Sequence, residues 1–243
     1  MNPEIIALIA VLVLAFLYSS VGHGGASAYL AIMTILSFPI ELIRPSALLM
    51  NLFVAGIAFV QYYRAGHFKW NIFWPFAVAS IPMAFAGAHI SLEPELYKRV
   101  LGLLLLVTVL RMFGLLGKGS SVVDNVPIIP AMIAGAVVGF VSGIIGIGGG
   151  IILSPLLLML NWSNMKTAAA VSAAFIWVNS LAGLIGLMNA GATLHADIWV
   201  WVAVALVGGL FGAYFGSRRL NNKQLRGVLG GVLLLAGLKL IFT

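Results

Sequence analysis

Two glycine-rich segments interrupt the apolar stretches of this chain, and their residues have the types and spacing that could do chemistry. The first runs from Ser19 to Ser27 and the second from Ser142 to Gly150. Glycine lets the backbone turn sharply and lets a ligand approach the peptide N–H groups closely. A helix that starts just after such a break presents unpaired N–H groups and the positive end of its dipole, which suits an anion. We therefore predict an anion site at the two breaks, built without a buried lysine or arginine.

Neutral polar residues near the breaks are the other candidates, because polar groups are costly in a bilayer and usually point inward. Asparagine could donate its amide N–H groups to an oxyanion, whereas a serine hydroxyl can bond to its own helix backbone. His23 is the one ionisable residue within the breaks, and it is a candidate for proton gating or for a structural hydrogen bond. The predicted substrate-binding residues are Gly22, His23, Gly24, Gly25, Ser27, Asn51, Gly146, Gly148, Gly149, Gly150, Ser172 and Asn179.

Purely structural roles are the alternative interpretation of these glycines and asparagines. Small residues line helix contacts throughout membrane bundles, so the glycines could serve close packing, and each asparagine could make an interhelical hydrogen bond. Nucleotide binding is excluded, because the chain has no G-K-[ST] and neither break follows a predicted strand. The four histidines share no metal-ligand spacing and there is no cysteine, so we predict no metal, no cofactor and no enzymatic activity.

Composition places the breaks inside a membrane. Of the 243 residues, 62% are hydrophobic and 8% are charged, and the mean hydropathy is +1.13. A soluble domain carries roughly a quarter charged residues, so a water-soluble globule is excluded. The long apolar stretches indicate helices, since a barrel would show short alternating strands. The formal charge of +7 is typical of Lys and Arg kept in cytoplasmic loops, so we expect a lipid bilayer as partner and no nucleic acid.

The second half of the chain repeats the first at an offset that drifts from 124 to 128 residues. Gly22-His23-Gly24-Gly25 aligns with Gly146-Ile147-Gly148-Gly149, and Val100-Leu101-Gly102 aligns with Val228-Leu229-Gly230. Ordered matches at a nearly constant offset predict a duplication, with residues 1–120 as the first membrane repeat and 121–243 as the second. The apolar segments expected are 4–21, 26–38, 45–63, 71–90 and 97–116, followed by 127–145, 150–161, 167–188, 197–217 and 224–242.

The loop cations indicate that the two repeats are oppositely oriented. An odd number of chain reversals per repeat places 9 of the 13 Lys and Arg residues on one face, which is then cytoplasmic. The expected fold is therefore an all-α integral membrane protein of two inverted repeats, each with a Gly-broken helix or re-entrant pair plus three spanning helices. The short segments 26–38 and 150–161 either span the membrane or re-enter it.

The second break, from Gly143 to Gly150, is followed by Ser154-Pro155 and by an Ala- and Ser-rich stretch from Ala168 to Ser180. With the duplicated chain, this pattern resembles the TauE/SafE family of sulfite exporters. The resemblance implies a permease in the inner membrane of a bacterial or archaeal cell that moves sulfite, thiosulfate or organosulfonates. The first break departs from the family pattern at His23 and Ala26.

The function expected is secondary transport of a small anion by alternating access, with the anion held between the two breaks. Because no ATP motif exists, the driving force is a gradient or the membrane potential, and the coupling ion is a His23-linked proton, a sodium ion or none. The alternatives are an anion channel of the same architecture and a transporter of another small organic anion such as a carboxylate. A homodimer is an open alternative to a monomer.

Overall fold

The breaks lie in a bundle of helices. A computed structural model describes residues 3–93, 95–96, 99–100, 102–103, 106, 109–110, 126–194, 196–219, 234 and 238, and within these ranges every regular element is a helix. The helices whose full extent lies within these ranges are α1 (Pro3–Ser20), α2 (Ala26–Ile35), α3 (Ile40–Arg64), α4 (Trp70–Ala88), α6 (Ile128–Ile145), α7 (Gly150–Met159), α8 (Met165–Asn189) and α9 (Ile198–Arg218). The expected segments 97–116 and 224–242 lie mostly outside the described residues.

Helix α3 starts five residues before the expected segment 45–63, because the charged residues Glu41 and Arg44 lie within the helix. Pro39 precedes the helix in an extended conformation, and Glu41 lies in its first turn, where a carboxylate suits the helix dipole. Arg44 therefore belongs to the helix, and its side chain is only 4% exposed.

Five helices within the described ranges are long and apolar enough to cross a membrane, and they make this a multi-pass membrane protein. They are Glu41–Arg64, Trp70–Ala88, Ile128–Ile145, Met165–Asn189 and Ile198–Arg218. Large apolar side chains cover the outside, such as Ile129 at 71% and Trp199 at 61% exposed. A water-soluble protein could not carry so many, whereas lipid tails solvate them readily.

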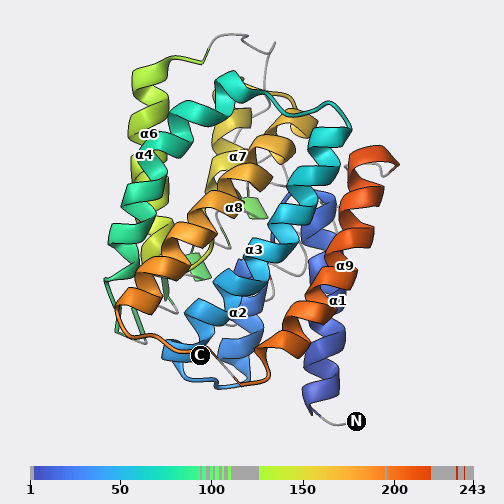
Figure 1. Cartoon of the computed structure of the whole chain (residues 1–243), viewed down its shortest axis with the longest axis vertical. Coiled ribbons are helices and arrows are strands. Elements are labelled where there is room, and N and C mark those ends of the chain that lie inside the picture. The colour runs from blue at the N-terminus through green and yellow to red at the C-terminus, as the bar shows by residue number, and fades with distance from the viewer. Residues whose placement is uncertain are drawn as a thin grey trace.

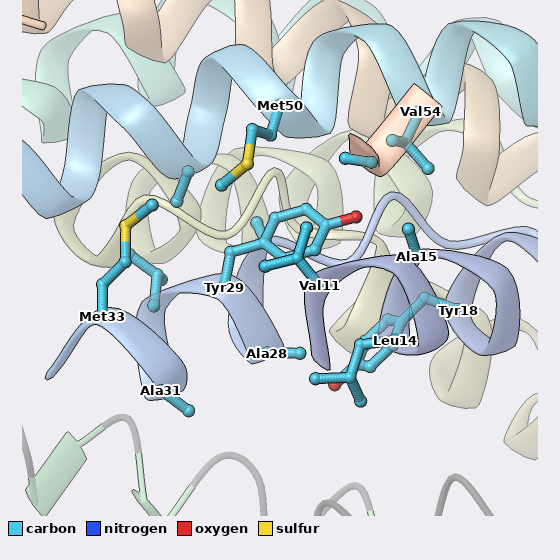
Figure 2. Close-up of a cluster of buried hydrophobic side chains, with 14 of the residues drawn as sticks. Val11, Leu14, Ala15, Tyr18, Ala28, Tyr29, Ala31, Met33, Met50 and Val54 are labelled. Carbon is cyan, nitrogen blue, oxygen red and sulfur yellow. The ribbon is translucent and has the colours of Figure 1, made fainter. Parts of the chain in front are cut away.

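The short helix α2 does not span. Its 10 residues rise only about 15 Å, about half the thickness of the hydrocarbon core. Figure 2 shows that the side chains from Val11 to Tyr18 in α1 follow one another in the opposite direction to those from Ala28 to Met33 in α2. Helix α2 therefore turns back beside α1 as a hairpin, and the ring of Tyr29 packs toward Met50 of α3 in the core (Figure 2).

Two pairs of helices flank a central crossing (Figure 1). Helix α1 packs along α9, α4 packs along α6, and α3 and α8 cross between the two pairs. Across the central crossing, Leu48 meets Gly183 and Gly56 meets Trp177. Because residue numbers rise along one helix as they fall along the other, α3 and α8 run antiparallel.

Each flanking pair is held by glycines spaced four residues apart. On α9 and α1 the contacts are Gly208 with Leu12, Gly212 with Phe16 and Gly216 with Ser20. On α6 and α4 they are Gly135 with Phe76, Gly139 with Ser80 and Gly143 with Ala84. In both pairs the numbers rise together, so the helices are parallel, and the backbones touch because no Cβ separates them.

Replacing Gly212 with alanine is expected to lower the free energy of unfolding by about 1–3 kcal/mol, since its Cβ would overlap the backbone carbonyl of Phe16. The measurement is chemical unfolding of the purified protein in detergent. Val207→Ala on the same helix is the control, because Val207 is 51% exposed and should change stability by less than about 0.5 kcal/mol. Equal effects of the two changes would contradict close packing at Gly212.

The helix bounds of the first part of the chain recur in the second. Adding 125 to the bounds of α1 and α3 gives those of α6 and α8, and adding 124 to the bounds of α2 gives those of α7. Positive φ angles recur likewise. The matching positions are Gly22 and Gly146, Gly25 and Gly149, Ser37 and Asn161, and Gly66 and Gly191.

Candidate functional site

The first break is a tight reversal between α1 and α2. The N–H of Gly22 donates to the carbonyl of Ser19 at 3.0 Å and that of His23 to the carbonyl of Tyr18 at 2.9 Å, which caps the end of α1. Gly22 and Gly25 have φ angles of 79° and 96°, a left-handed conformation that favours glycine. The chain therefore needs both glycines to end one helix and start the next within five residues.

The second break follows the same design. The N–H of Gly146 donates to the carbonyl of Ser142 at 2.7 Å at the end of α6. Gly146, Gly148 and Gly149 have φ angles of 85°, 72° and 78°, and Gly149 is the residue before the first turn of α7. Each short helix thus begins directly after a left-handed glycine, with its first N–H groups turned toward the break.

The side chain of Asn51, in the middle of α3, joins the two breaks. Its Oδ1 accepts the N–H of Ala26, the first residue of α2, at 3.1 Å. Its Nδ2 donates to the carbonyl of Ile147 in the second break at 3.4 Å and to Ser180 Oγ of α8 at 2.9 Å. Asn51 is 1% exposed. One neutral side chain thus binds the start of α2, the second break and the opposite central helix.

Helix α8 supplies the other wall of the second break. Gly150 packs against Ile176 and the carbonyl of Ser172, and Gly149 packs against the ring of Phe175. The hydroxyl of Ser172 accepts that of Ser154 at 2.6 Å, which ties α7 to α8. Ser172, Ile176 and Asn179 are three or four residues apart, so they share one face of the helix.

Three predicted site residues bond within the protein in this conformation. Ser27 Oγ lies 2.9 Å from Tyr18 OH. Asn179 Nδ2 donates to the carbonyl of Phe175 at 2.8 Å, and its Oδ1 is buried without a hydrogen-bond partner among the described residues. His23 is partly exposed, its Nδ1 lies 3.1 Å from the carbonyl of Val21, and the ring also interacts with the backbone of Gly150 in the second break.

The breaks themselves are closely packed. A Cβ at Gly22 would lie 2.6 Å from Cα of Ala169 in α8, and one at Gly148 would lie 2.5 Å from Asn51 Nδ2. The same glycines therefore fit both the interpretation as close helix packing and the interpretation as an anion site. The contacts that leave no room for a Cβ are also the contacts that bring the two breaks together.

Sequence reasoning missed Arg44 and Tyr29. Arg44 is buried, and its Cβ lies 3.4 Å from where a Cβ on Gly146 would be, so the expectation of breaks without a buried lysine or arginine is wrong. Its guanidinium tolerates burial because it donates to main-chain carbonyls. Glu41, three residues before Arg44, was the local signal that the helix had already begun.

Tyr29→Phe is expected to cost about 1–2 kcal/mol of unfolding free energy, because it leaves a buried carbonyl unsatisfied. The Tyr29 hydroxyl donates to the carbonyl of Gly24 at 2.9 Å, and the side chain is fully buried. Thermal unfolding in detergent measures the loss. Tyr63→Phe should leave stability unchanged, because Tyr63 is 59% exposed. If both variants behave as wild type, the Gly24 bond does not stabilise the break.

The described residues hold no group of three or more His, Asp or Glu side chains that could bind a metal ion.

A family model described as "Sulfite exporter TauE/SafE" matches residues 6–240, nearly the whole chain. The chain belongs to the TauE/SafE family. As a member of the TauE/SafE family, the protein is a membrane transporter and not an enzyme.

Relatives agree with this assignment. "Probable membrane transporter protein y4hK" from Sinorhizobium fredii is 38% identical over 247 residues, which cover 100% of both chains. "Probable membrane transporter protein YunE" from Bacillus subtilis is 32% identical over 109 residues, 44% of this chain and 38% of the relative. "Probable membrane transporter protein MJ0441" from Methanocaldococcus jannaschii is 31% identical over 117 residues, 45% of this chain and 43% of the relative. No solved structure matches the chain significantly.

Proposed function

We propose that this TauE/SafE member is a secondary transporter that moves small sulfur anions, namely sulfite, thiosulfate or organosulfonates, across the inner membrane of a bacterial or archaeal cell. The anion is held where the two breaks meet. The observation that carries the proposal is the side chain of Asn51, which contacts the start of α2 and the second break at once.

The chemistry at this place suits an anion. Helices α2 and α7 both begin at the breaks, and the positive ends of their dipoles favour negative charge. Between Ser19 and Ser27 and between Ser142 and Gly150 the sequence has no Asp or Glu that would repel it. The neutral donors and the backbone N–H groups replace the hydration shell that an oxyanion loses in a dry site.

Alternating access is supported by the arrangement of the helices. Helices α3 and α8, whose bounds recur at an offset of 125, run antiparallel. Corresponding helices of opposite direction are what two inverted repeats, 1–120 and 121–243, would produce. The close packing at both breaks favours an occluded transporter over an open channel, because a continuous pore would need free space at the glycines.

Flux into proteoliposomes tests the proposal. Labelled sulfite, thiosulfate and methanesulfonate are compared with acetate, with and without proton and sodium gradients, and protein-free liposomes provide the blank. We expect saturable uptake of the sulfur anions and faster uptake when the liposomes contain unlabelled anion. Flux that does not saturate and shows no such counterflow would identify a channel. A preference for acetate would replace the sulfur anions by carboxylates.

A further inference from the structure

The guanidinium of Arg44 is buried between the ends of two helices. Its Nη1 donates to the carbonyl of Ile90 at 3.2 Å, and its Nη2 donates to the carbonyls of Ala88 at 3.3 Å and Gly143 at 2.9 Å. Ala88 is the last residue of α4, and Gly143 lies in the last turn of α6. One side chain of α3 therefore binds the carboxyl ends of both helices of the α4–α6 pair.

These carbonyls need a partner of this kind. The last four carbonyls of a helix have no acceptor role within the helix, and together they form the negative end of its dipole. Arginine suits such a place, because its planar group carries five donors and its charge cannot be lost. In a membrane interior the bonds also offset the high cost of burying the charge.

The end of α6 leads directly into the second break. Gly146 follows Gly143 by three residues, and its Cβ position lies 3.4 Å from Cβ of Arg44. Helix α7 begins four residues later, at Gly150. The position in which Arg44 holds the end of α6 therefore sets the position of the first N–H groups of α7. Its charge also offsets the negative end of α6, which would otherwise face the anion.

We propose that Arg44 is a positioning residue for the α7 half of the anion site. It clasps the ends of α4 and α6 to α3, and it lowers the electrostatic cost of holding an anion beside the end of α6. The part of this proposal that concerns the anion rests on the proposed function. The clasp of α4 and α6 to α3 can be tested without any substrate.

Lys166 provides a matched control. It lies in the first turn of α8, as Arg44 lies near the start of α3, and its Nζ reaches the carbonyl of Ser217 near the end of α9 at 3.4 Å. Lys166 is half-buried, and the end of α9 does not lead into either break. Lys166→Met thus removes a cation from the end of a helix that does not lead into α7.

Cysteine labelling tests the clasp, because the chain has no cysteine of its own. Ser142→Cys places a thiol in the last turn of α6, and Ser19→Cys places one at the end of α1; both serines are at most 1% exposed. In Arg44→Met, we expect N-ethylmaleimide to label position 142 at least about tenfold faster, while position 19 stays protected. Lys166→Met should leave the labelling rate at position 142 unchanged. Unchanged labelling at 142, or equal acceleration at both positions, would overturn the clasp.

Transport kinetics test the link to the anion. Arg44→Met should raise the KM for the transported anion about tenfold, with a smaller change in the maximal rate, because the start of α7 shifts and the negative end of α6 is no longer offset by a charge. Arg44→Lys should recover part of the affinity, because it keeps the charge but loses the planar guanidinium that donates to several carbonyls at once. An equal fall in maximal rate at unchanged KM would overturn the inference. If wild-type protein moves none of the tested anions, the proposed function fails, and the labelling result still decides the clasp.

Discussion

Replacing Asn51 with leucine is expected to reduce anion flux by about 100-fold and to lower the free energy of unfolding by roughly 2–4 kcal/mol. The substitution removes three hydrogen bonds at once, to the N–H of Ala26, the carbonyl of Ile147 and the hydroxyl of Ser180. Each of these groups would be left buried without that partner. The loss of flux follows because the lost bonds are those that hold the two breaks against each other.

Two further substitutions separate these contributions. Asn51→Asp keeps an acceptor for the start of α2 but loses the donor and buries a negative charge beside the carbonyl of Ile147, so it should transport poorly and be no more stable than the leucine variant. Ser46→Ala on the same helix is the control, because this buried hydroxyl has no hydrogen-bond partner among the described residues. Flux into proteoliposomes and unfolding in detergent measure both quantities. Wild-type flux in a folded Asn51→Leu protein would refute the proposed site.

Gly22→Ala is expected to cost about 3–5 kcal/mol of unfolding free energy, far more than Gly66→Ala. The two glycines have almost the same φ, 79° and 77°, so alanine suffers the same backbone strain of about 1–2 kcal/mol at either position. They differ in the room available for an added Cβ. A Cβ at Gly22 would lie 2.6 Å from Cα of Ala169, whereas nothing lies within 4 Å of one at Gly66. The excess at Gly22 is the cost of forcing the first break away from α8.

Gly146→Ala extends the comparison to the second break. Gly146 has a φ of 85°, but the nearest atom to its added Cβ is Arg44 Cβ at 3.4 Å, an ordinary contact. Its cost should therefore resemble that of Gly66→Ala and not that of Gly22→Ala. Thermal and chemical unfolding of the three variants under one set of detergent conditions give the values. Three equal losses would mean that backbone strain alone explains these glycines.

Local signals explain why much of the fold could be predicted. Apolar runs of about 20 residues indicate membrane helices whatever surrounds them, and the expected segments 71–90 and 127–145 differ from α4 and α6 by at most two residues at either end. Glycine clusters mark the breaks because left-handed backbone favours glycine, and Gly22, Gly25, Gly146 and Gly149 all have positive φ. The start of α3 could not be predicted in this way, because a charged residue such as Arg44 can belong to a helix as well as to a loop.

The sequence by itself determined that the protein is helical, that it lies in a membrane, and where its helices are interrupted, since composition and glycine spacing are properties of neighbouring residues. Only the tertiary structure decided what the interruptions contact. Asn51 meets Ile147 and Ser180, 96 and 129 residues further along the chain. Arg44 meets Gly143 across 99 residues. Such partners depend on how the helices pack and cross, which leaves no local mark in the residues between them.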